Sequence, residues 1–127
     1  MCGNQLKLLL SGDKFKIYGF VVNGTCEAEN FLNELSDKEK TKITPLLHYT
    51  ANNGLLRNEQ KFKSIGDDIF EFKGFQSRLL CFFDKGGIII LSHGCIKKRN
   101  KLDPSEIKKA RKRKDNYFSK GGKNDFA

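Results

Sequence analysis

The sequence predicts an α+β fold: a small, twisted, mainly antiparallel sheet with a helical hairpin on one face and a basic C-terminal helix. Three observations lead to this prediction. Short segments rich in β-branched and aromatic residues recur along the chain, at 16–23, 67–75, 78–84 and 88–91. Two stretches with apolar residues at helical spacing separate the first segment from the second. A third helix start follows the last segment, so the predicted order is β-α-α-β-β-β-α.

The first strand is expected over 16–23, where Asn23-Gly24 ends it. Thr25 is the expected N-cap of the first helix, which carries an apolar stripe from Ala28 to Leu35. This stripe is typical of a helix that lies on a sheet.

The second helix opens at Ser36-Asp37-Lys38-Glu39, an S-x-x-E pattern typical of a capping box. Asn53-Gly54 supplies its end. Pro45 falls inside this helix, so we expect a kink or a late start. The two helices together suggest an antiparallel hairpin.

Residues 67–75 alternate in character, with Phe70 and Phe72 on one face and Glu71 and Lys73 on the other. The segments 78–84 and 88–91 follow, and the unbroken apolar run of the latter predicts a central strand. Asp103-Pro104-Ser105-Glu106 combines an N-cap acid, a proline at the first helical position and a later glutamate. It predicts the start of the last helix.

The length of 127 residues suits one domain, which we place at 14–118. Residues 1–13 are expected to be a flexible extension and residues 119–127 a disordered basic tail. No segment is long and apolar enough for a membrane span or a signal peptide, and the four cysteines are scattered. We therefore expect a cytoplasmic protein with reduced thiols, no metal, no cofactor and no membrane partner.

Positive charge is concentrated in the C-terminal part of the chain. The formal net charge is +9, and twelve Lys and Arg stand against four acids from Lys97 to the end. That distribution indicates a polyanionic partner, with nucleic acid as the first candidate. A solvated basic helix is the alternative.

Five local motifs occur in the order found in one protein superfamily. They are Lys16-Ile17-Tyr18, Leu55-Leu56-Arg57, I-F-E-F-K at 69–73, S-R-L-L at 77–80 and L-S-H-G-C-I-K-K at 91–98. The last is similar to L-L-H-G-F-x-K-K of the RelE/ParE toxins, and the chain most resembles their HigB-like, phage-derived branch. It departs from the pattern at Cys95, at Pro45 and in residues 1–13.

This resemblance implies the toxin of a type II toxin–antitoxin system, a metal-independent and ribosome-dependent messenger RNA endoribonuclease. The implied partners are the ribosome, messenger RNA and a cognate helix-turn-helix antitoxin of the HigA kind. Two alternatives remain: a ParE-like DNA gyrase poison on the same fold, and a non-catalytic nucleic-acid-binding module.

The candidate catalytic residues are Arg78, His93, Lys97 and Lys98. Metal-free cleavage needs a group that stabilises charge on the phosphate, and the guanidinium of Arg78 suits that task. At the start of a strand, its head is expected to reach out of the sheet. His93 has an ordinary pKa suited to proton transfer, although a structural histidine is an equal alternative. Lys97 and Lys98 are candidates for charge neutralisation or, with a lowered pKa, for the base.

A second set of residues is expected to bind RNA through charge or stacking. Lys73 is alternatively a plain ion pair with Glu71, and the aromatic member alternatively packs in the core. The set is Arg57, Lys73, Arg99, Lys101, Lys108, Arg111, Lys112 and Tyr117.

Overall fold

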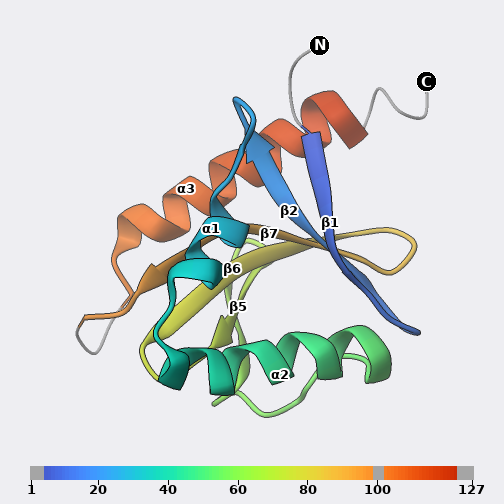
Figure 1. Ribbon diagram of the computed structural model, residues 1–127. Coiled ribbons are helices and arrows are strands. Elements are labelled where there is room, and N and C mark those ends of the chain that lie inside the picture. Colours follow the sequence, from blue (N-terminus) through green and yellow to red (C-terminus); the bar gives the residue numbers. More distant parts are fainter. Residues whose placement is uncertain (1–4, 99–101, 123–127) are drawn as a thin grey trace.

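The computed structural model describes residues 5–98 and 102–122, with the side chains of 120–122 left aside. Within them the chain forms one seven-stranded sheet in the order β1-β2-β7-β6-β5-β4, with β3 paired to β2 (Figure 1). All pairings are antiparallel except that of β2 with β7. The strands are β1 Gln5–Ser11, β2 Lys16–Val22, β3 Thr25–Cys26, β4 Phe62–Gly66, β5 Ile69–Lys73, β6 Ser77–Asp84 and β7 Ile88–Ile96.

Helices cover both faces of this sheet, so the predicted α+β class is confirmed. α1 (Glu27–Glu34) and α2 (Asp37–Asn53) lie on one face, whereas α3 (Pro104–Asn116) crosses the other, as Figure 1 shows. Each face has its own apolar core. The first contains Ile43, Leu47, Phe72, Leu79 and Ile89, and the second contains Phe20, Leu80, Phe82, Ile90 and Ala110.

The alternation of side chains between the two faces of β7 shifts by one residue at Ser92. Leu91 pairs with Cys81, and His93 pairs with Leu80, so Ser92 is the extra residue of a β-bulge. Beyond the bulge, His93 and Cys95 lie on the α3 face. Gly94 then faces α1, where a Cβ atom would stand 2.1 Å from the ring of Phe31.

The expectation for the N-terminus was wrong over most of its length. Residues 5–11 form β1, which pairs antiparallel with β2 and places Leu6, Leu9 and Leu10 against the two cores. Without β1, the hydrogen-bonding edge of β2 would stand open. At the other end, the six-residue π-helix η1 (Tyr117–Gly122) continues α3 into the predicted tail. Residues 123–127 lie outside the described part of the chain.

The helical region also differs in detail from the expectation. Thr25 belongs to β3 and pairs with Val22, so Cys26 rather than Thr25 precedes α1. α2 begins at Asp37 and continues through Pro45, so the predicted late start was wrong. Pro45 is exposed, and solvent can satisfy the carbonyl that its ring leaves without an N–H partner.

Strand β4 was not expected, because its apolar residues are few. It pairs with β5 through the turn at Asp67 and Asp68, both of which have positive φ angles. In the described part of the chain, no helix combines the length and hydrophobicity that crossing a bilayer requires.

Candidate functional site

Two rows of residues paired across the strands, each with charged members, cross the α3 face near the strand ends. Strand alternation puts Glu71 and Lys73 of β5 on the face opposite Phe72. One row runs through Lys73, Arg78 and Cys95, which pair across β5, β6 and β7.

The parallel row contains Lys63, Glu71, Leu80 and His93, which pair across β4, β5, β6 and β7. The sheet therefore gathers residues that are far apart in the sequence.

Lys73 lies within the electrostatic reach of this cluster. Partial burial lowers the pKa of Lys73, and the charges of Arg78, Lys63 and Lys97 act in the same direction, while Glu71 opposes them. Its ammonium group donates a hydrogen bond to the carbonyl of Glu59 at 3.2 Å. The lowered pKa therefore reflects burial first, and the neighbouring cations add to it.

Arg78 lies at the floor of that surface, with only 6% of its area exposed. Its Nη1 donates to the carbonyls of Ser77, at 2.9 Å, and Gly74, at 3.3 Å. Its Nε lies 3.8 Å from Oε1 of the buried Glu71. The guanidinium is thus turned inward, contrary to the expectation that its head would reach out of the sheet.

His93 is also buried, and both of its ring nitrogens have partners. Nδ1 lies 2.8 Å from the hydroxyl of Ser92, and Nε2 lies 2.9 Å from Oε1 of Glu106. Because burial disfavours the imidazolium, it lowers the pKa of His93, although the hydrogen bond to Glu106 acts in the opposite direction. A neutral His93 with its proton on Nε2 satisfies all three groups, and it holds Glu106 in place.

Glu106 lines a groove between the end of β7 and the start of α3. Figure 1 shows these two ends side by side. The groove is lined by Lys97, Lys98, Leu102, Asp103 and Glu106, among others. The carboxylate of Glu106, 30% exposed, therefore shares one surface with two of the predicted catalytic residues. Burial raises the pKa of the neighbouring Cys95 thiol to about 12. The charge of Glu106 also raises this pKa, whereas the charge of Arg78 lowers it.

Five of the six basic residues of α3 fall into two groups. Lys109 and Arg113 both bind Glu27 of α1 at 2.7 Å, and Arg111 binds Asp67 at 2.5 Å. These cations attach α3 to the rest of the fold, so their charge is largely matched. Lys108 and Lys112 are exposed.

The other predicted RNA-binding residues differ in their exposure to solvent. Tyr117 is 7% exposed, and its hydroxyl donates to Asp84 at 2.6 Å. It packs against Phe82 in the core, which was the alternative prediction to stacking on RNA. Arg57 is exposed on the loop after α2. Arg99 and Lys101 lie outside the described residues.

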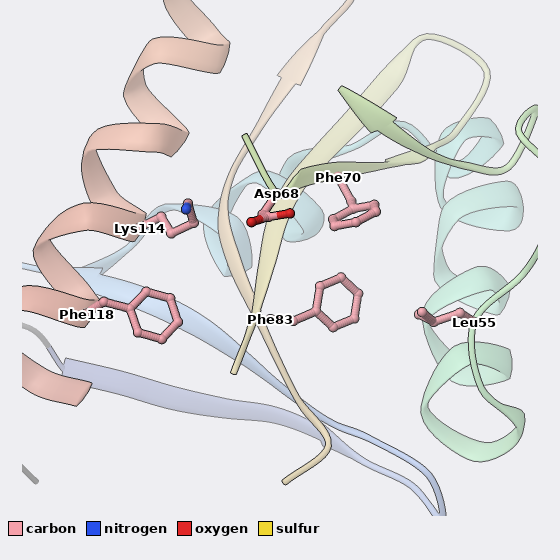
Figure 2. Close-up of a pocket in the computed structure, with 6 residues that line it drawn as sticks. All are labelled: Leu55, Asp68, Phe70, Phe83, Lys114 and Phe118. Atoms are coloured by element: carbon pink, nitrogen blue, oxygen red, sulfur yellow. The ribbon is translucent and has the colours of Figure 1, made fainter. Parts of the chain in front are cut away.

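A second hollow lies at the opposite end of β6 from Arg78. Figure 2 shows Phe118 and Lys114 on its α3 side and Leu55 across from them, with Phe70 and Phe83 between. Its lining is mainly apolar. Among the described residues, no group of His, Cys, Asp and Glu could hold a metal ion.

Glu106 and Lys63 were not among the site residues predicted from the sequence. The pattern around Glu106 predicts only a helix start, and no strand was expected at Lys63. The turn residues Gly66-Asp67-Asp68 before an alternating segment could have revealed the β4–β5 hairpin.

The sequence model of one protein family matches residues 30–115 of the chain. That family is described as "Phage derived protein Gp49-like (DUF891)". The match covers both charged rows and most of α3. A search of curated proteins found no match.

Proposed function

Since the chain belongs to the phage-derived Gp49-like family, a RelE-like toxin family of toxin–antitoxin systems, we propose that it is a toxin that cleaves messenger RNA on the ribosome. The observation that carries this proposal is the convergence of four cations and one partly exposed carboxylate on the α3 face. Lys63, Lys73, Arg78 and Lys97 supply the positive charge, and Glu106 supplies the carboxylate.

In the proposed reaction, the ribose 2′-oxygen attacks the adjacent phosphorus and the bond from phosphorus to the 5′-oxygen breaks. The products are a 2′,3′-cyclic phosphate and a 5′-hydroxyl. The step needs a proton acceptor, charge stabilisation on the phosphate and a proton donor for the leaving oxygen.

Glu106 is the proposed proton acceptor. Its carboxylate lines the groove, and the hydrogen bond from His93 fixes its orientation. His93 is therefore a positioning residue in this proposal, because neither of its nitrogens faces the groove without a partner. This modifies the expectation that His93 itself transfers the proton.

The cations take the other two tasks. Lys73 and Lys97 contact the scissile phosphate, and the buried Arg78 stabilises its negative charge from below. Lys98, at the rim of the same groove, protonates the leaving 5′-oxygen. No step in this scheme involves a metal.

Cleavage can be tested with purified protein, ribosomes and a defined messenger RNA analysed by primer extension. We expect discrete cleavage sites with wild-type protein and a loss of at least about 100-fold with Glu106→Gln. Glu29→Gln, which changes a partly exposed carboxylate on α1 that is paired with Lys7 away from the groove, is the matched control. An intact messenger at several salt concentrations would refute the proposal, and inhibition of DNA supercoiling by gyrase would favour the ParE-like alternative.

The HigB-like branch implies a helix-turn-helix antitoxin as partner and a cytoplasmic location. The supporting observation is the same surface, since an inhibitor that covers the groove would silence the site. Co-expression with the protein of the adjacent reading frame tests this partner. We expect a stable complex that suppresses cleavage, and continued cleavage in its presence would contradict the assignment.

A further inference from the structure

An exposed aromatic residue stands at the tip of the β5–β6 turn. The ring of Phe75 is 49% exposed and belongs to neither core. Two lysines of α2, one helical turn apart, approach it: the Nζ atoms of Lys38 and Lys42 lie 5.1 and 4.6 Å from the ring centroid. An exposed aromatic ring beside two cations offers both stacking and charge to a nucleic acid.

The turn that carries Phe75 is held firmly. The carboxylate of Glu39 accepts hydrogen bonds from the N–H groups of Phe75, Gln76 and Ser77, and from the hydroxyl of Ser77. Four neutral donors fill the hydrogen-bonding capacity of this carboxylate and stabilise its negative charge. Phe75 is thus presented at a fixed position, which lowers the entropy that a stacked ligand would cost.

The Phe75 turn adjoins the proposed cleavage groove. The N–H of Lys97 donates to the carbonyl of Gln76 at 2.8 Å, and Arg78 follows the turn directly. Figure 1 shows the β5–β6 loop beside the first turn of α2, at the same edge as the end of β7. Phe75 therefore lies at the same edge of the sheet as the Lys97 side of the groove.

We propose that Phe75, Lys38 and Lys42 form an accessory subsite for single-stranded RNA, outside the cleavage groove. An unpaired base stacks on the ring of Phe75, and the two ammonium groups engage the phosphates on either side of that base. The subsite rests on the proposed function, since it binds the same substrate strand.

The single aromatic ring makes the subsite tolerant of base identity. Every base has a π face that can stack on the ring, so no base is selected by hydrogen bonds. The side chains of Lys38 and Lys42 are flexible, so their ammonium groups can leave the ring and bind a phosphate when a base stacks there.

Binding to 2′-O-methyl RNA, which cannot be cleaved by 2′-oxygen attack, tests the subsite directly. We expect Phe75→Ala to weaken a ten-nucleotide strand by about 5- to 100-fold. Tyr49→Ala is the matched control, because Tyr49 is equally exposed, at 48%, on the later half of α2.

A spectroscopic variant separates stacking from a merely structural role. The chain has no tryptophan, so Phe75→Trp introduces a single reporter. We expect RNA to quench its fluorescence, and a strand with one abasic nucleotide at the stacking position to leave it unquenched. Tyr49→Trp should respond to neither strand. Lys38→Ala and Lys42→Ala should each reduce the salt slope of binding by about 0.7.

The outcomes separate the two proposals. If wild-type protein cleaves messenger RNA but Phe75→Ala binds every strand as the wild type does, the subsite is refuted and the proposed function stands. If Phe75→Ala weakens only the antitoxin complex, the surface binds protein and the subsite is likewise refuted. If wild-type protein binds no RNA and cleaves none, both proposals fail.

Discussion

Glu39 and Arg78 hold the same turn from opposite faces of the sheet. The carboxylate of Glu39, on α2, accepts from the N–H groups of residues 75–77 at 2.8–3.2 Å. The guanidinium of Arg78 donates to the carbonyls of Gly74 and Ser77 in that turn. A helix on one face thereby fixes the backbone that carries a proposed phosphate-stabilising residue on the other.

Replacing Glu39 should loosen this turn. Glu39→Gln removes the charge that strengthens four hydrogen bonds, so we expect a loss of about 1–2 kcal/mol in the free energy of unfolding. RNA cleavage should fall as well, because Arg78 loses its fixed backbone. Urea denaturation measures the first effect. Glu34→Gln, an exposed glutamate on α1, is the control and should change neither quantity.

The contact between Glu39 and the β5–β6 turn should also affect how the free energy of unfolding depends on pH in acid. Hydrogen bonds from Ser77, Gln76 and Phe75 lower the pKa of Glu39, although burial acts in the opposite direction and is the largest single influence. The folded state therefore binds this proton less tightly than the unfolded state. The stabilisation is present above about pH 4.5 and is lost as pH falls through the folded pKa. Glu39→Gln should lack this dependence, and an unchanged acid limb would contradict the assignment.

Substitutions at the Arg78–Glu71 pair should affect the free energy of unfolding and the cleavage rate differently. Both residues are 6% exposed, so Arg78→Leu leaves a buried carboxylate without its cation and should cost about 3–5 kcal/mol. The double variant Arg78→Leu, Glu71→Leu removes both charges and should recover most of that loss. Cleavage should remain at least about 100-fold down in the double variant. Activity that returns with stability would remove Arg78 from the proposed reaction.

His93 should make the fold sensitive to mild acid. Burial lowers its pKa, and the neighbouring Lys109 and Arg113 act in the same direction, whereas Glu106 opposes them. Because the unfolded state takes up the proton more readily, stability is lost as pH falls below about 6.5. The limiting slope is about 1.4 kcal/mol per pH unit.

Urea denaturation between pH 7.5 and 5 can assign that slope. We expect His93→Gln to abolish it. His48→Gln should retain it, because His48 is the other histidine of the chain and is exposed. Equal slopes in the two variants would show that another group is responsible.

Local sequence patterns predicted most elements but could not predict what two of their residues do. Ser36 and Asp103 cap their helices as expected, accepting from the N–H groups of Glu39 and Ser105. In a capping box the following glutamate turns back to the cap. Here Glu39 instead binds the β5–β6 turn, and Glu106 binds His93. Both partners come from distant strands, and no local pattern indicates them.

The site itself depends on strand register. Alternation predicted that Glu71 and Lys73 share a face, and the structure confirms it. The bulge at Ser92 decides which face His93 and Cys95 take, and a one-residue shift reverses every later side chain. Gly94 shows the same limit, since its need for a small residue comes from Phe31 on a separate helix.

The two groups of cations on α3 should respond differently to substitution. Hydrogen bonds from Arg113 and Lys109 lower the pKa of Glu27 to about 2, although partial burial opposes them. Arg113 also donates to the carbonyl of Ser92 at 2.8 Å and lies over the ring of Phe20. Arg113→Ala should therefore cost about 2–3 kcal/mol in the free energy of unfolding.

Lys108→Ala and Lys112→Ala should instead leave stability within about 0.5 kcal/mol of wild type, because both side chains are exposed. If they contact RNA phosphates, each substitution reduces the slope of log affinity against log salt by about 0.7. Fluorescence anisotropy over a salt series measures that slope. Unchanged slopes in both variants would show that α3 serves mainly to cover the sheet, and that the strand-borne cations carry the affinity for RNA.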